Sequence, residues 1–242
     1  MPGKVPYYQA TRHPWPSFLM LLPLLAFYEG GIFWLGGPQA ETLRNGADAW
    51  MRWGLDTIGV HFAYTPPALI ALFFLVWSYA VRDKRPQDLV GIVTGMVIEA
   101  VFFAIGLWGL SRALGPVLNH FGIQLLWSPA RVEAIGQSIT FIGAGIYEEV
   151  LFRLLLFSAL LFVLRLVTLP PLLAVPLAAA GSAALFSGAH HVGPFGEAYD
   201  PYVFLFRTLA GVYFALVYRL RGFGIAAGAH ALYDVVVGVR MG

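Results

Sequence analysis

Long stretches of apolar residues, separated by short segments rich in charged and turn-forming residues, dominate the hydropathy pattern of this chain. A transmembrane helix needs roughly 20 mostly apolar residues to cross the hydrocarbon core of a bilayer, and several of the stretches approach or exceed that length. The sequence therefore predicts an all-α fold, a polytopic bundle of about seven membrane-spanning helices over approximately residues 17–35, 67–81, 89–114, 134–167, 172–191, 202–218 and 222–239.

Two segments depart from the pattern of a simple span. Between residues 41 and 59, apolar side chains recur at helical spacing among arginines and aspartates, which predicts an amphipathic helix at the membrane interface. The stretch 134–167 is longer than one bilayer crossing at about 1.5 Å per residue, so we expect it to tilt, kink or protrude. A loop that holds Gly115, Pro116, Asn119 and Pro129 should precede it.

The charges that flank the spans predict their topology. The first apolar run follows basic residues, as in a signal peptide, but it is too long and no small-residue cleavage site follows it, so we expect a retained helix. Arg112 and Arg131 fall on one side of the expected spans. The opposite side, which is predicted to be cytoplasmic and to hold the N-terminus, carries more basic residues: Lys4, Arg12, the cluster at 82–85, Arg165, Arg219 and Arg221.

Composition supports a multi-pass protein of the cell membrane. Hydrophobic residues make up 59% of the 242 residues and charged residues only 12%, against about 25% charged in a typical soluble domain. The net charge of +2 is small and the basic residues are scattered, which argues against nucleic acid as a partner. The chain has no cysteine, so any chemistry must come from Glu, Asp, His, Ser or Tyr.

The most unusual polar residues are Glu148, Glu149 and Arg153, in the middle of the fourth apolar stretch. Charged groups inside a span cost about 2.5–3.5 kcal/mol each, so a helix keeps them where they are paired or face a polar cavity. Glu149 and Arg153 are four residues apart and should pair, which leaves Glu148 available as a base. Taken alone, the motif fits equally well a structural role in which the three residues lock helices together.

Two later spans also carry polar residues of the kind found in active sites. The fifth ends at the adjacent His190 and His191, and the seventh contains His230 and Asp234, four residues apart on one helical face. Each histidine alone is more typical of a satisfied core residue. Glycine and alanine are frequent in both spans, so the helices can approach closely, and together the residues favour one functional site.

These motifs resemble those of the CPBP family of intramembrane proteases, also called the CAAX protease and bacteriocin-processing family. The pattern EExxxR is similar to Glu148, Glu149 and Arg153. FxxxH is similar to Phe186 and His190, and HxxxN or HxxxD is similar to His230 and Asp234. The resemblance covers roughly the last 110 residues, so we divide the single membrane domain into N-terminal helices, 1–130, and a catalytic helical core, 131–242.

The resemblance implies that Glu148 and His190 activate water against a peptide carbonyl, while His230 and Asp234 hold the oxyanion. An older view of the family implies a metal, and zinc would then be bound by Glu148, His190 and His230. We favour the metal-free mechanism, without a cofactor, because the zinc-protease motif HExxH is absent. Asp234 stands where the prenyl-protein proteases of the family have Asn, and an ionised Asp cannot donate a hydrogen bond. It is then either protonated or orients His230.

The leading hypothesis is an endopeptidase that cuts peptide or protein substrates in or at the membrane, lipidated ones among them, in contact with membrane lipid. One alternative is a non-catalytic membrane protein, such as a bacteriocin self-immunity protein or an assembly scaffold. Another is a proton-coupled transporter with a carboxylate relay, although no internal repeat supports it. The relay would use Glu29, Glu99 and Glu148; outside it, Glu29, Glu99 and Arg207 receive no role.

Overall fold

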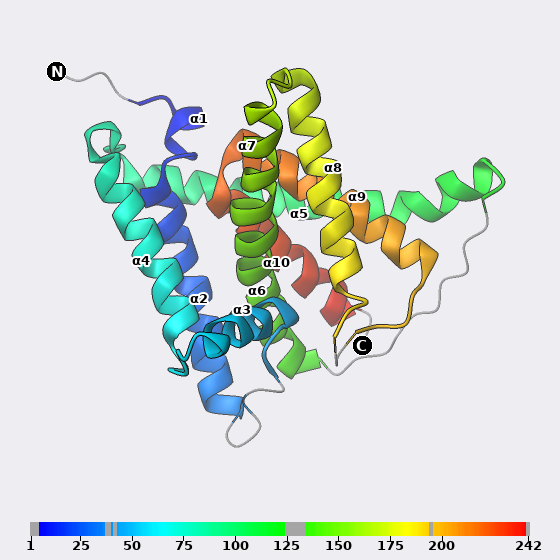
Figure 1. The fold of residues 1–242 in the computed structure, drawn as a ribbon, viewed down its shortest axis with the longest axis horizontal. Helices are drawn as coiled ribbons and strands as arrows, with labels where there is room; N and C mark the ends of the chain where they lie inside the picture. Colours follow the sequence, from blue (N-terminus) through cyan, green and yellow to red (C-terminus); the bar gives the residue numbers. More distant parts are fainter. Residues whose placement is uncertain (1–4, 37–39, 41–42, 124–133, 194–195, 241–242) are drawn as a thin grey trace.

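The computed structural model describes residues 5–36, 40, 43–123, 134–193 and 196–240, and every regular element in these ranges is helical (Figure 1). The predicted all-helical fold class is therefore confirmed. In chain order the elements are α1 (Tyr7–Ala10), α2 (Pro14–Gly36), α3 (Gly46–Thr57), α4 (Thr65–Ala80), the 3-10 turn η2 (Arg82–Lys84), α5 (Leu89–His120), α6 (Ala134–Glu149), the π-helical segment η3 (Val150–Phe157), α7 (Ser158–Leu166), α8 (Pro171–Ala189), α9 (Pro201–Arg221) and α10 (Phe223–Arg240).

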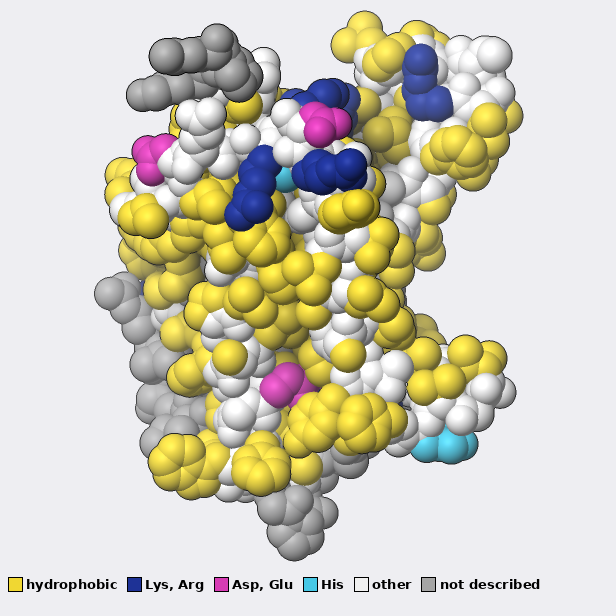
Figure 2. All heavy atoms as spheres, turned by 90° about the vertical axis from the view of Figure 1, so that its left-hand side faces the viewer, with side chains coloured by type: hydrophobic (Ala, Val, Ile, Leu, Met, Phe, Trp, Pro, Cys, Tyr) yellow, Lys and Arg dark blue, Asp and Glu magenta, His cyan; other side chains and the backbone are white. Residues whose placement is uncertain are grey.

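The helices have the lengths and composition of a polytopic membrane protein. Within the described residues, two apolar helices are shorter than a full span, Thr65–Ala80 and Phe223–Gly238. Hydrophobic side chains cover most of the face drawn in Figure 2, and lysines and arginines gather near one end of it. In the part of the chain that the structure describes, four helices are long and apolar enough to cross a membrane: Pro14–Leu35, Leu89–His120, Pro171–Ala189 and Pro201–Arg221.

The long apolar stretch that begins at residue 134 is not one uniform α-helix. Its path is divided into α6, η3 and α7, and the π-helical segment begins directly after Glu149 and contains Arg153. π-helical turns inside helices are rare and frequently occur at functional sites. The length of the stretch predicted an irregularity, and the structure shows that this irregularity lies at the charged motif.

The predicted loop is wrong at Gly115, Pro116 and Asn119, because α5 continues through all three to His120, while Pro129 lies outside the described residues. Proline inside a helix removes one backbone hydrogen bond, and here it lies in the last turns of a helix of 32 residues. The remaining hydrogen bonds of the helix therefore keep its end helical. In the view of Figure 1, α5 runs across the direction of α2, α4 and α6.

Within the predicted amphipathic segment 41–59, of which residues 41–42 lie outside the described residues, the structure has the helix α3 over Gly46–Thr57. Its start is capped by Asn45, whose side chain accepts a hydrogen bond from the backbone N–H of Asp48 at 2.7 Å. Figure 1 shows α3 lying across one end of α2 and α6, and it packs on α6 and α4. The helix therefore lies across the bundle, as expected for an interfacial segment.

α10 is the central helix, in contact with α2, α5, α6 and α9. Two helix contacts require residues without large side chains. A Cβ atom at Gly145 of α6 would lie 2.5 Å from the backbone nitrogen of Ala231 in α10, and one at Gly211 of α9 would lie 2.7 Å from the Cβ of Ala183 in α8. Small residues thus let α6 approach α10, which carry two of the three motifs, and let α8, which carries the third, approach α9.

Candidate active site

Glu149 and Arg153 form a buried ion pair at the junction of α6 and η3. Arg153 Nε lies 3.3 Å from Glu149 Oε2, and the two side chains are 1% and 0% exposed. The guanidinium also lies 4.5 Å from the centre of the Phe186 ring, within the range of a cation–π contact. The pairing predicted from the spacing of the two residues is present, and the pair is sealed from solvent.

Glu149 has a second partner that sequence reasoning missed. His230 of α10 donates a hydrogen bond from Nδ1 to Glu149 Oε1 at 2.8 Å. The His230 ring stacks on Phe214 of α9, with 4.4 Å between the ring centres. Its other nitrogen, Nε2, lies 3.4 Å from Asp234 Oδ2, one turn along α10. His230 is therefore held by a carboxylate on one edge and an aromatic ring on one face.

Glu148 lies between two histidines. Its Oε1 is 3.9 Å from His190 Nε2, and its Oε2 is 3.7 Å from His230 Nε2. Both separations are longer than a direct hydrogen bond, and water molecules commonly bridge polar groups at such distances. The Glu148 side chain is 12% exposed, in contrast to its sealed neighbour. Of the two adjacent glutamates, only Glu148 is therefore reachable by water.

The two adjacent histidines after α8 have different surroundings. His190 Nδ1 donates to the backbone carbonyl of Phe186 at 3.0 Å, and its Nε2 faces Glu148. His191 Nδ1 instead contacts the backbone carbonyl of Glu197 at 3.0 Å. The fold therefore brings His190 to Glu148 and turns His191 towards the following loop, in agreement with the FxxxH spacing.

Sequence reasoning also missed Phe214, which covers one face of the His230 ring. A phenylalanine in an apolar helix carries no signal that separates it from ordinary core residues. Phe186 differs, because it belongs to the FxxxH motif. Its ring lies edge-on to both histidines, with ring centres 5.0 Å from His190 and 6.2 Å from His230. Two phenylalanines therefore shape the apolar side of the polar cluster.

The alternative zinc site would use Glu148, His190 and His230. A catalytic zinc site needs three protein ligands about 2.0–2.2 Å from one ion and an open position for water. Within the part of the chain that the structure describes, no three His, Asp or Glu side chains are arranged to hold a metal ion. The mechanism proposed below therefore contains no step through a metal.

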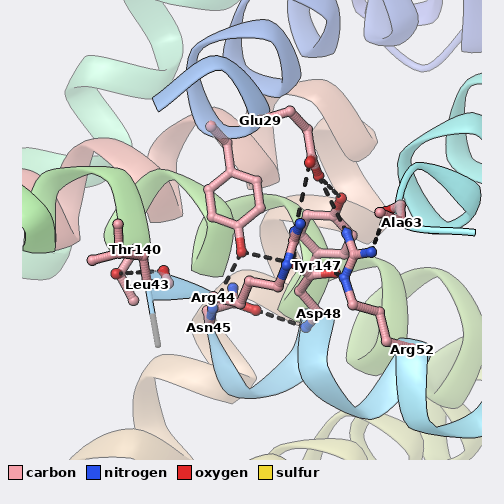
Figure 3. Close-up of polar contacts among 10 residues, drawn as sticks. Glu29, Leu43, Arg44, Asn45, Asp48, Arg52, Ala63, Thr140 and Tyr147 are labelled. Atoms are coloured by element: carbon pink, nitrogen blue, oxygen red, sulfur yellow. Dashed lines mark hydrogen bonds and ion pairs between the residues drawn. The ribbon is translucent and has the colours of Figure 1, made fainter. Parts of the chain in front are cut away.

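A second buried polar cluster joins α3 to α2 and α6 (Figure 3). Asp48 of α3 lies 2.9 Å from Arg44 Nη1 and 2.8 Å from Arg52 Nε. Glu29 of α2 forms longer ion pairs with the same two arginines, at 3.5 and 3.7 Å. Tyr147 of α6 donates its hydroxyl hydrogen bond to Glu29 at 2.7 Å. Glu29, which received no role from the sequence, is thus part of an ion-pair network.

The other two unassigned residues also have partners. Glu99 of α5 accepts two hydrogen bonds from Arg221, at 2.6 and 2.7 Å. Arg207 of α9 forms an ion pair with Glu197 at 2.8 Å. Among the described residues, no hydrogen bond or ion pair joins the three carboxylates of the transporter hypothesis, Glu29, Glu99 and Glu148.

Comparison with protein families identifies the part of the chain that holds the site. Residues 131–236 match the family described as Type II CAAX prenyl endopeptidase Rce1-like. This segment is Rce1-like. The match spans all three motifs and confirms the resemblance to the CAAX protease family, while α1 to α5 lie outside the Rce1-like segment. Comparison with curated proteins and with solved structures gave no match.

The apolar helices and the Rce1-like match together support an integral membrane protein. The description of the matched family names a CAAX prenyl endopeptidase, which is a peptide hydrolase. The residues singled out by the sequence lie in one connected cluster within the Rce1-like segment: Glu148, Glu149, Arg153, His190, His230 and Asp234.

Proposed function

We propose that this chain is an intramembrane endopeptidase in which Glu148, assisted by His190, activates a water molecule. The observation that supports this role is the arrangement around Glu148, whose accessible carboxylate faces the Nε2 atoms of two histidines at 3.7 and 3.9 Å. A general base must lie within reach of the proton that it removes, directly or through one water. A water between Glu148 and His190 meets that condition.

In the proposed reaction, Glu148 takes a proton from this water while the water oxygen attacks the carbonyl carbon of the scissile peptide. His190 binds the same water and orients it, because its Nδ1 is already committed to a backbone carbonyl. When the tetrahedral intermediate collapses, the C–N bond breaks and the proton held by Glu148 passes to the leaving amine. Glu149 and Arg153 keep His230 and the helix junction in place.

We assign His230 to the oxyanion that forms on the substrate carbonyl. Its Nδ1 hydrogen bond to Glu149 is made, so Nε2 can donate to an oxyanion only when both ring nitrogens carry hydrogen. Three carboxylates, Glu148, Glu149 and Asp234, lie within 3.7 Å of the ring nitrogens and balance the charge of that imidazolium. Asp234 in this role orients His230 and makes no contact with the oxyanion itself.

The proposed substrates are proteins or peptides held at the membrane by a lipid, with prenylated C-termini as the first candidates because of the Rce1-like match. We propose a cell-membrane location with the N-terminus in the cytoplasm, on the basis of the basic residues that gather at one end of the spans. Mechanism, substrate and orientation can be tested separately.

The test is cleavage of fluorogenic peptides by the purified full chain in liposomes. The peptides are a farnesylated C-terminal peptide, the same peptide without the lipid, and a transmembrane peptide. Glu148→Gln should reduce turnover by about 10²–10⁴-fold, the usual contribution of a general base, and a metal chelator should leave wild-type turnover unchanged. Glu99→Gln is the matched control, since it removes a carboxylate that is bonded to Arg221 outside the cluster.

Each result separates this mechanism from an alternative. Loss of wild-type cleavage on addition of chelator would overturn the metal-free mechanism. Glu148→Gln that is folded and as active as Glu99→Gln would overturn the role of Glu148. If folded wild-type protein cleaves none of the three peptides, the scaffold hypothesis gains over the protease.

A further inference from the structure

A cavity separate from the Glu148 cluster opens at the end of the bundle where α4 and α7 end. Its volume is about 420 Å³, and none of the six site residues lines it. Three arginines from three different parts of the chain surround it, Arg12, Arg165 and Arg219. Apolar walls complete it, including the side chains of Trp77, Phe157 and Phe162. The lining of the cavity thus combines cationic side chains with apolar walls that are suited to hydrocarbon.

The polar groups of the cavity are suited to an anion. No Asp or Glu is among the described residues that line it, so none of these lining residues neutralises the arginines. Arg12 and Arg219 are exposed, and Arg165 uses one nitrogen for the backbone carbonyl of Leu169 at 2.9 Å, which leaves other N–H groups available. Ser17 accepts a hydrogen bond from the backbone of α10, so its hydroxyl hydrogen remains available. Arginine is the residue that best recognises phosphate oxygens.

The position of the cavity favours a lipid over a small anion. α4 and α9 are apolar helices, and basic residues follow or end them: Arg82 and Lys84 after α4, and Arg219 and Arg221 in the last turn of α9. Basic pockets between membrane helices bind anionic headgroups at such interfaces. A free phosphate would leave the aromatic and aliphatic walls without a partner, whereas an acyl chain would cover them.

We propose that this cavity binds an anionic phospholipid, with its phosphate at Arg12, Arg165 and Arg219 and part of an acyl chain along Trp77, Phe157 and Phe162. The hydrocarbon of the lipid thus meets the apolar walls, and its headgroup meets the arginines. The binding itself does not depend on the proposed protease activity. It adds a specific lipid site to the general contact with the bilayer.

Two residues that line the cavity are linked by hydrogen bonds to the segment that carries the buried ion pair. Ser158 lies 3.3 Å from the hydroxyl of Tyr218, and both residues line the cavity. Ser158 also donates to the backbone carbonyl of Arg153 at 3.2 Å, inside η3. If the proposed protease function holds, a bound lipid therefore contacts the residues that support Arg153 and, through it, Glu149.

The experiment is native mass spectrometry of the purified full chain with phosphatidylglycerol or with phosphatidylcholine of identical acyl chains, in the absence of any substrate. We expect the wild type to retain phosphatidylglycerol preferentially. The double substitution R165Q/R219Q should reduce that retention by about 30-fold, the effect expected for two arginines near a lipid headgroup. The matched control is R82Q/R85Q, which removes the same charge at the same end but outside the cavity.

A second variant tests the apolar part of the site. Leu161 lines the cavity, so L161W should fill it and reduce retention of phosphatidylglycerol with all three arginines intact. Equal retention of the two lipids by the wild type would overturn the proposal, and so would equal losses in the two arginine double variants. Displacement of phosphatidylglycerol by an equal concentration of inorganic phosphate would show a small-anion site instead. Turnover of Glu148→Gln decides the protease mechanism independently of all these results.

Discussion

Two buried polar clusters in this chain use similar residue types but differ in how the charges of their carboxylates are balanced. The cluster around Glu29 and Asp48 sets two carboxylates against two arginines, and Asp48 in addition accepts a hydrogen bond from Tyr28 at 2.9 Å. The cluster around Glu148 sets three carboxylates against Arg153 and two histidines. The first cluster is balanced by permanent charges, whereas the balance of the second depends on the protonation of its histidines.

The difference separates a structural role from a chemical one. Charged groups inside a membrane protein are retained where they are paired or where they serve a function. Asp48 is fully buried and bonded on several sides. Glu148 makes no hydrogen bond to any described residue and is accessible to water. A buried carboxylate without a fixed partner, next to two histidines, is the arrangement expected of a base.

The largest expected effect distinguishes the two adjacent histidines. Because only His190 faces Glu148, His190→Ala should lower turnover by about 10²–10⁴-fold, as for loss of a group that handles the reacting water. His191→Ala is the matched control and should stay close to wild-type turnover. The measurement is the initial rate of peptide cleavage in liposomes, with folding checked by thermal unfolding. A stronger effect at His191 would contradict the assignment.

An intermediate effect is expected in the cluster around Glu29 and Asp48, and it should appear in stability and not in turnover. Asp48→Asn leaves two arginines without their main carboxylate partner, so the free energy of unfolding should fall by about 3–5 kcal/mol. Asp56→Asn, at an exposed aspartate of the same helix α3, is the control and should change stability little. Denaturant unfolding in detergent measures both. If Asp48→Asn instead lowers the turnover of folded protein and spares stability, the clusters do not have separate roles.

The smallest expected effect tests the contact between the cluster around Glu29 and Asp48 and the helix α6. Tyr147→Phe removes one hydrogen bond to the carboxylate of Glu29 and should reduce the free energy of unfolding by about 2 kcal/mol. Tyr213→Phe removes a hydrogen bond to a neutral backbone carbonyl and should cost about half as much. Turnover should change little in both. A tenfold loss of turnover in Tyr147→Phe alone would show that this contact also positions the neighbouring Glu148.

Local spacing along the chain was sufficient to predict several features. The apolar stretches predicted the helices, and the alternation of charged and apolar residues between 41 and 59 predicted the interfacial helix. The four-residue spacings predicted that Glu149 and Arg153 would pair, as they do at 3.3 Å. Such features follow from the period of the helix, which determines which side chains share a face. The limit of this reasoning appears at Pro116, where α5 continues to His120.

Contacts between helices were decided only by the tertiary structure. The way α8 is placed in the bundle brings His190, which follows it, to Glu148. The hydrogen bond from His230 to Glu149 joins two residues that are 81 positions apart in the sequence. The close approach that allows it depends on Gly145 against Ala231. The sequence by itself thus determined the helices, the polar motifs and the resemblance to the CAAX protease family. Packing decided which polar residues meet, because helical periodicity acts only within one helix, while contacts between helices depend on how their surfaces fit together.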